Sequence, residues 1–152
     1  MHRYELVPEL AAWEAHNSTE DTPVGWASCM GSFSLAAAYA SLVWPSFTEV
    51  QGMVFRGEVD ESDILAWLRA ENTSKQSVQA TLNHLHLLDI QHPGIWSDAT
   101  EGQLKFLGAT LRDAWSAKLT RDFPSREFVV EFFEGSGDDL REYQVTFYER
   151  EA

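Results

Sequence analysis

The hydrophobic pattern of the chain changes its period near residue 124. Before that point, apolar residues recur every three or four positions, as on one face of an α-helix. They are Leu104, Leu107, Leu111, Ala114, Trp115 and Leu119. Thr100 and Gln103 have the capping-box spacing that opens a helix, and Pro124 cannot continue one. The pattern therefore predicts a long helix between Thr100 and Pro124.

After Pro124 the apolar residues alternate, which is typical of strands that bury one face. The alternation runs over 128–132, stops at a Gly- and Asp-containing loop, and resumes over 143–147. This pattern predicts a β-hairpin over 126–149. Because an isolated hairpin is only marginally stable, a third strand is expected, and residues 48–56 are the best candidate.

The first half of the chain predicts mostly helices. Residues 4–16 have helical spacing of their apolar side chains. In residues 28–43 small and apolar side chains occupy all sides, which predicts a helix buried by its neighbours. Asp60 and Thr73 can each cap a further short helix. The region therefore supplies helices to cover a sheet.

These elements together predict an α+β fold in a single domain, residues 1–152. The expected sheet is small and mainly antiparallel, with one strand near 48–56 beside the C-terminal hairpin 126–149, covered by about five helices. A chain of this length can bury a hydrophobic core without disulfide or metal crosslinks.

The charge of the chain restricts its partners. There are 24 acidic residues against 11 Lys and Arg, a net charge of −13. Such a chain is repelled by nucleic acids and by anionic membranes, so we expect neither as a partner. A basic protein partner is favoured instead. The chain has one cysteine, and its N-terminus shows no basic region followed by an apolar stretch, as a signal peptide would. These features predict a cytoplasmic protein.

The carboxylates gather in two clusters that flank the expected strands. The first comprises Glu58, Asp60, Glu61 and Asp63, and the second Glu134, Asp138, Asp139 and Glu142. One face of the expected hairpin adds aromatic side chains, including Phe133 and Tyr148. Acidic groups with aromatic anchors are suited to binding a basic protein, and we take these ten residues as the candidate partner-binding site. Alternatively, the clusters serve helix capping and solubility.

A second hypothesis starts from Cys29. The segment 25–32 resembles the local layout of papain-like thiol hydrolases, in which a cysteine opens a helix. This resemblance implies Cys29 as nucleophile, His84 or His86 as base, and Asp89 as the group that orients the base. The two histidines share a face on a strand but not on a helix. Alternatively, the cysteine is a small buried apolar residue and the His-rich segment makes structural polar contacts.

Other chemistry has no sequence support. The histidine spacing lacks a zinc signature such as His-Glu-x-x-His, and no glycine-rich phosphate loop occurs. We therefore expect neither a metal nor a cofactor. Oligomeric state is not predicted by any feature of the sequence.

As a class, the chain resembles the small acidic immunity proteins that neutralise bacterial toxins. Segments such as 44–56 and 122–133 have the style of small bacterial proteins, and the resemblance carries no functional residue over. It implies an exposed acidic surface with a few aromatic anchors, opposed to a basic toxin site. The leading hypothesis is thus an acidic binding module that neutralises or blocks a basic protein, with the thiol hydrolase as the alternative.

Overall fold

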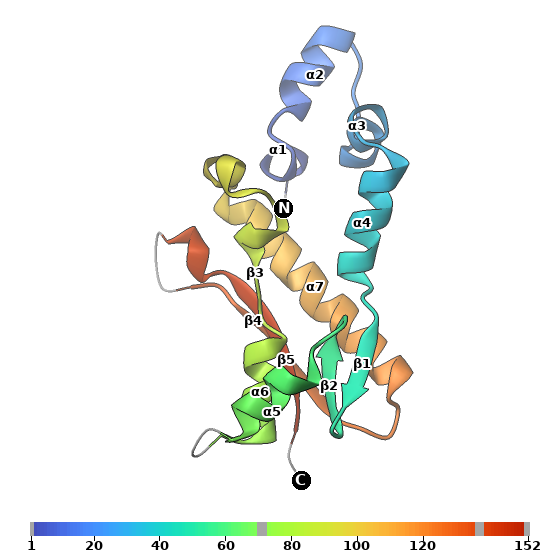
Figure 1. Ribbon diagram of the computed structural model, residues 1–152. Helices are drawn as coiled ribbons and strands as arrows, with labels where there is room; N and C mark the ends of the chain where they lie inside the picture. Colours follow the sequence, from blue (N-terminus) through green and yellow to red (C-terminus); the bar gives the residue numbers. More distant parts are fainter. Residues whose placement is uncertain (1, 70–72, 136–138, 151–152) are drawn as a thin grey trace.

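The computed structural model describes residues 2–69, 73–135 and 139–150 (Figure 1). It confirms the α+β class, with helices packed around two small antiparallel sheets. The α-helices are α1 (Arg3–Leu6), α2 (Leu10–Asn17), α3 (Pro23–Met30), α4 (Phe33–Val43), α5 (Glu61–Arg69), α6 (Lys75–Leu82) and α7 (Glu101–Asp122). The strands are β1 (Phe47–Val50), β2 (Met53–Arg56), β3 (Leu85–His86), β4 (Phe128–Phe133) and β5 (Gln144–Glu149). The short 3₁₀ helices in the described residues are η1 (Leu87–Ile90), η2 (Pro93–Asp98) and η3 (Leu140–Glu142).

The predicted C-terminal hairpin is present as β4 and β5. Its register places Val130 opposite Phe147 and Phe132 opposite Val145. These side chains point to the face that α7 covers, where Val145 and Phe147 are fully buried. The alternation of apolar residues in the sequence therefore predicted the buried face correctly, because a strand places every second side chain on the same side.

Helix α7 also follows its sequence signals. The Thr100 hydroxyl accepts a hydrogen bond from the Gln103 main-chain N–H at 3.2 Å, and Gln103 Oε1 accepts one from the Thr100 main-chain N–H at 3.0 Å. The helix ends at Asp122, and its buried face consists of Leu104, Gly108, Leu111, Trp115, Lys118 and Leu119. A Cβ on Gly108 would lie 2.1 Å from the Phe132 ring, so glycine lets α7 and β4 approach closely.

The prediction of one strand over 48–56 is wrong. The segment is a hairpin of β1 and β2, turned by Gln51 and Gly52, which both have positive φ, at 54° and 74°. Two consecutive residues with positive φ form a tight turn whose twist matches that of the paired strands. This hairpin forms its own two-stranded sheet, and the third strand beside β5 is β3, in the histidine-rich segment.

Buried side-chain amides connect the two sheets. Asn83, directly after α6, is fully buried. Its Nδ2 donates to the carbonyl oxygens of Val54 and Phe147 at 3.0 and 3.2 Å, and its Oδ1 accepts from the Arg56 main-chain N–H at 2.9 Å. Gln79 Oε1 accepts from the Val54 N–H at 3.1 Å. These amides satisfy main-chain groups on β2 that a neighbouring strand would otherwise pair.

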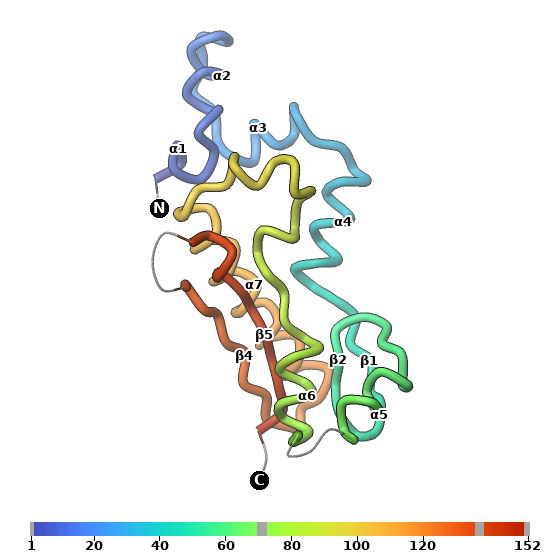
Figure 2. Tube along the Cα trace, turned by 60° about the vertical axis from the view of Figure 1, so that its left-hand side comes forward, coloured from blue at the N-terminus to red at the C-terminus, as the bar shows by residue number. Residues whose placement is uncertain are grey.

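The prediction of a buried helix over 28–43 is also wrong. The segment is divided at Gly31 into α3 and α4, and neither helix contains a buried residue. Together with α2, these helices project beyond the sheets (Figures 1 and 2). The large exposed apolar side chains on them are Val24, Met30, Phe33 and Leu35. No described element covers this surface over most of its length.

Some helix boundaries also differ from those predicted from the sequence. The helix expected over 4–16 is divided into α1 and α2 near Pro8. Ser74 caps α6 by accepting from the Ser77 N–H, so the predicted cap at Thr73 is off by one residue. Asp60, as predicted, stands at the start of α5.

Candidate functional site

The first acidic cluster lies between β2 and the first turn of α5. All four of its carboxylate residues are exposed. Asp60 Oδ1 accepts from the Ser62 main-chain N–H at 2.8 Å, and hydrogen bonds from the Ser62 hydroxyl and N–H hold the pKa of Asp60 below its usual value. Glu61 accepts from the Gln51 amide at 2.6 Å. Within the described ranges, no Lys, Arg or His forms an ion pair with any of the four.

An exposed tryptophan stands beside this cluster. Trp67 is 43% exposed and follows Asp63 by one helical turn, so both lie on the same side of α5. Ile64, directly after Asp63, is fully buried and holds α5 against the core. Trp67 was not among the binding residues predicted from the sequence. We define the α5 surface as Glu58, Asp60, Glu61, Asp63 and Trp67.

The second acidic cluster is neutralised in part by the protein's own cations. Glu134 forms an ion pair with Lys105 at 3.5 Å, and Asp139 forms one with Arg141 at 2.7 Å. Hydrogen bonds from the Arg141 side chain and main chain lower the pKa of Asp139 to about 2. Asp138 lies outside the described residues. The two clusters therefore differ in how much of their charge remains unpaired.

The aromatic residue Phe133 lies at the end of β4 and is 43% exposed. It borders a shallow depression together with His86, Arg141 and Glu142. Glu142 is exposed at this edge. The fold thus brings Phe133 and members of the second cluster together, as the hairpin prediction required.

Tyr148 lies on the outer face of the hairpin and is half-buried. Its hydroxyl donates to Glu131 Oε1 at 3.1 Å. On the same face Thr146 is buried and donates to the Ala80 carbonyl at 2.6 Å, because α6 packs over β5. Helix α6 thus removes Thr146 from solvent, so the expected aromatic and polar surface is smaller than the sequence suggested.

The candidate thiol site is arranged differently from its prediction. Cys29 is the second-last residue of α3 and is exposed, rather than buried or at a helix start. His84 and His86 pack edge to face with ring centroids 5.1 Å apart, so the two side chains share a face, as expected on a strand. His86 Nδ1 lies 3.0 Å from the Arg141 carbonyl oxygen, and Asp89 is exposed in η1. In the described part of the chain, neither histidine nor Asp89 forms a hydrogen bond or ion pair with the thiol.

Searches for a metal site and a membrane-spanning helix, and comparisons with known proteins, gave no further indication of function. Among the described residues, no three His, Cys, Asp or Glu side chains are grouped so that they could hold a metal ion. No described helix combines the length and the apolar character needed to cross a bilayer. Comparison of the chain with models of known families, with curated proteins and with solved structures gave no match. The candidate site is therefore argued from its own geometry.

Proposed function

We propose that this protein is an acidic protein-binding module that neutralises or blocks a basic protein partner, in the manner of an immunity protein that blocks a toxin. The observation that carries the proposal is the α5 surface. Its carboxylates are exposed and lack ion-pair partners among the described residues, and Trp67 stands beside them. Carboxylates steer a basic partner toward the surface, while a tryptophan supplies contact area when the partner covers it.

Helix capping accounts for only part of the cluster. Asp60 caps α5, and the helix dipole favours Glu61 and Asp63 in the first turn. One carboxylate suffices for the cap, however, and Glu58 precedes the helix altogether. The second cluster shows the alternative arrangement, in which carboxylates pair with the protein's own cations. The surplus charge at α5 therefore supports recognition of a basic surface.

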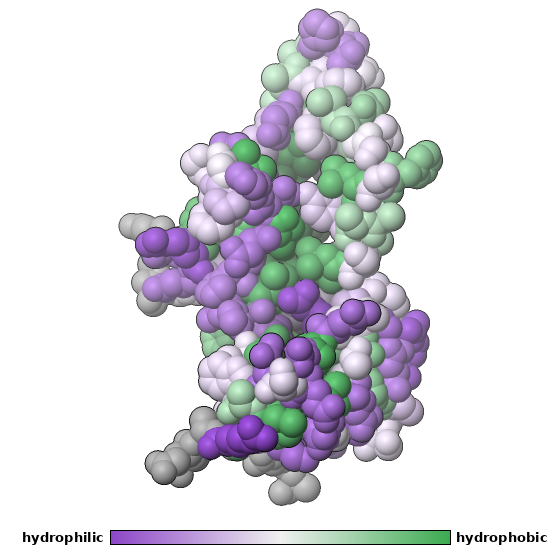
Figure 3. Space-filling model, in the orientation of Figure 1, coloured by the Kyte–Doolittle hydropathy of each residue, from purple (hydrophilic) through white to green (hydrophobic). Residues whose placement is uncertain are grey.

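The exposed apolar surface of α3 and α4 supports a protein partner as well. Residues 22–48 contain no charged residue and no histidine. Phe33, in this segment, is 97% exposed. Figure 3 shows hydrophobic side chains gathered along these helices. Large exposed apolar patches on a protein commonly mark surfaces that another molecule covers.

Charge-neutralised variants test the proposal. The test variant removes three charges of the α5 surface and keeps the capping Asp60; its substitutions are Glu58→Gln, Glu61→Gln and Asp63→Asn. The matched control removes the same charge from exposed acids elsewhere; its substitutions are Glu9→Gln, Glu20→Gln and Asp98→Asn. Immobilised wild type and both variants are then exposed to an extract of the host cell at about 50 mM and about 500 mM salt, since salt screens exposed charges.

A basic protein captured by wild type and by the control, but not by the test variant, supports the proposal. Capture should fail at the higher salt, because the attraction is between exposed charges. Trp67→Ala should weaken capture at the lower salt concentration, because the tryptophan contributes apolar contact area. Equal capture by the test variant and the control, or a partner indifferent to salt, contradicts the proposal.

A further inference from the structure

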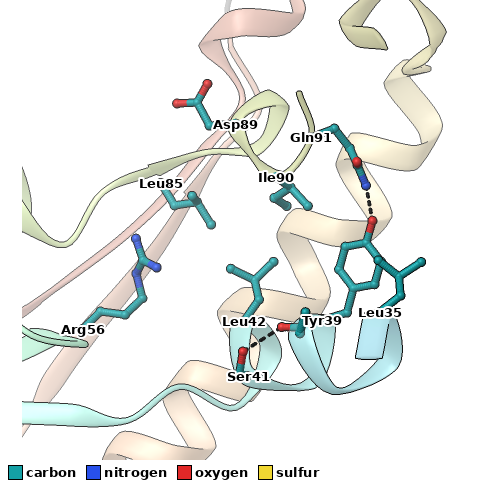
Figure 4. Close-up of a pocket in the computed structure, with 10 residues that line it drawn as sticks. Leu35, Tyr39, Ser41, Leu42, Arg56, Leu85, Asp89, Ile90 and Gln91 are labelled. Atoms are coloured by element: carbon teal, nitrogen blue, oxygen red, sulfur yellow. Dashed lines mark hydrogen bonds between the residues drawn. The ribbon is translucent and has the colours of Figure 1, made fainter. Parts of the chain in front are cut away.

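A cavity of about 500 Å³ lies where α4 faces β2, β3 and η1 (Figure 4). Apolar and polar side chains both line it, and the larger apolar ones are Leu35, Leu42, Leu85 and Ile90. Sites that hold small molecules have volumes of roughly 300–1,000 Å³ and combine apolar walls with a few polar groups. Residues from distant parts of the chain form this cavity, which is separate from the α5 surface.

Of the residues that the structure describes, Arg56 is the one cation that lines this cavity. Its Nε is buried and has no hydrogen-bond partner among the described residues. Most arginines of the chain pair with a carboxylate, at 2.5–3.6 Å, whereas Arg56 pairs with none in the described part. Asp89 also borders the cavity, but its carboxylate points away from the guanidinium (Figure 4). A half-buried cation without an acceptor is costly to keep.

The arginine is held in place before any ligand arrives. Its main-chain N–H donates to Asn83 Oδ1 at 2.9 Å. Its guanidinium lies over the Trp115 ring, 5.4 Å from the ring centroid. The indole is fixed in turn, because Trp115 Nε1 donates to the Leu42 carbonyl at 3.0 Å. A donor positioned in this way loses little conformational entropy when it binds.

We propose that this cavity binds the carboxylate of an apolar ligand, with Arg56 as the residue that recognises it. A guanidinium only donates hydrogen bonds, and its planar fork matches a carboxylate. The apolar walls then contact the body of the ligand. A second negative charge on the ligand is disfavoured, because Asp89 stands at the border and the chain carries a net charge of −13. The expected ligand is thus a monocarboxylate.

Such a group has two sources, a free apolar acid or the C-terminal carboxylate of a polypeptide that ends in an apolar residue. Both present the same chemistry to Arg56. They differ in what precedes the carboxylate, so an acetylated amino acid and a longer acetylated peptide with the same last residue distinguish them. The inference does not depend on the proposed function, since it concerns other residues.

Calorimetric titration with defined probes tests the proposal. Hexanoate is compared with hexan-1-ol and hexylamine, which share its apolar body and lack the carboxylate. A six-carbon acid in a site of this kind is expected to bind with a Kd on the order of 1 mM. The alcohol and the amine should bind at least about ten times more weakly, because neither gives the guanidinium a charged acceptor.

Three variants place the binding in the cavity. Arg56→Met removes the cation, keeps an unbranched side chain over the Trp115 ring, and should weaken hexanoate binding at least about tenfold. Arg69→Met makes the same charge change at an exposed arginine on α5 and should leave binding unchanged. Ala38→Leu fills the cavity without altering any charge and should also weaken binding. If Arg56→Met does not fold, as judged by circular dichroism, the Ala38→Leu variant decides.

Three results would each overturn the proposal. They are equal binding of hexanoate and hexan-1-ol, undiminished binding by the folded Arg56→Met or Ala38→Leu variant, and no saturable binding of hexanoate to wild type. If hexanoate binds as expected, N-acetyl-leucine and a tetrapeptide ending in leucine identify the source. Tighter binding of the peptide indicates a polypeptide C terminus, and equal or weaker binding indicates a free acid. Both of these last results support the carboxylate site.

Discussion

The single substitution Asn83→Ala should destabilise the fold strongly. Asn83 is fully buried, and its side chain makes three hydrogen bonds to the main chain of both sheets. The alanine variant leaves two carbonyl oxygens and one N–H without their partners. It also leaves Arg56 without the contact that fixes its main chain.

The magnitude follows from these three groups. Each main-chain group left buried and unpaired costs about 1–3 kcal/mol, and water entering the space recovers part of this. We therefore expect a loss of about 3–5 kcal/mol in the free energy of unfolding. That is a large share of the roughly 5–15 kcal/mol that stabilises a typical domain. Asn83→Asp should cost at least as much at neutral pH, because a carboxylate cannot donate to the two carbonyls and is buried as a charge.

Urea unfolding at 25 °C, followed by tryptophan fluorescence and circular dichroism, measures this loss. Asn17→Ala is the matched control, because Asn17 is exposed and its amide donates only to the Trp13 carbonyl, at 2.8 Å. The control should lie within about 0.5 kcal/mol of wild type. A loss below about 1 kcal/mol for Asn83→Ala would refute the reasoning that side-chain amides join the two sheets.

Three further outcomes are expected. Gly108→Ala should lower the unfolding free energy, because the added methyl group meets the Phe132 ring on β4. Gly102→Ala on the same helix has open space around its methyl group and should leave the unfolding free energy unchanged or raise it. Urea unfolding of both variants checks these expectations. In a carboxyl NMR titration, Asp139 should titrate near pH 2, and Arg141→Met should return its pKa toward 3.8. Because the folded pKa lies below the unfolded one, this pair stabilises the fold above about pH 4 and loses that effect as the pH falls toward 2. Cys29 should react with a thiol reagent in the folded protein, and a thiol that reacts only in urea would contradict its exposed position.

The parts of the fold that local sequence determines were predictable. The capping box at Thr100 and the alternation over 128–132 and 143–147 depend on neighbouring residues only, so the sequence displays them directly. The hairpin of β1 and β2 was missed because its turn at Gln51 and Gly52 is only two residues long and interrupts the strand pattern little. Strand β3 has two residues, and its pairing depends on β5, far along the chain.

The candidate sites were predictable only where they are local in sequence. The four carboxylates of the first acidic cluster lie within six consecutive positions, so the sequence composition revealed them. Their lack of ion-pair partners could be seen only in the structure. The side of α5 on which Trp67 lies depends on how the helix docks through Ile64. The cavity around Arg56 is assembled from separate segments, and no local pattern signals it. The apolar character of α4 wrongly predicted a buried helix, because composition alone does not show whether another element packs on it.

The central claim is that the carboxylates of the α5 surface recognise a basic partner. The most direct measurement is the dissociation constant of the captured, purified partner at about 150 mM salt, for wild type, the triple α5 variant and the charge-matched control. The account predicts that the α5 variant binds at least about tenfold more weakly than wild type and that the control binds within about threefold of it. Equal losses in the two variants would contradict the account, because they would show that net charge alone, and not this surface, attracts the partner.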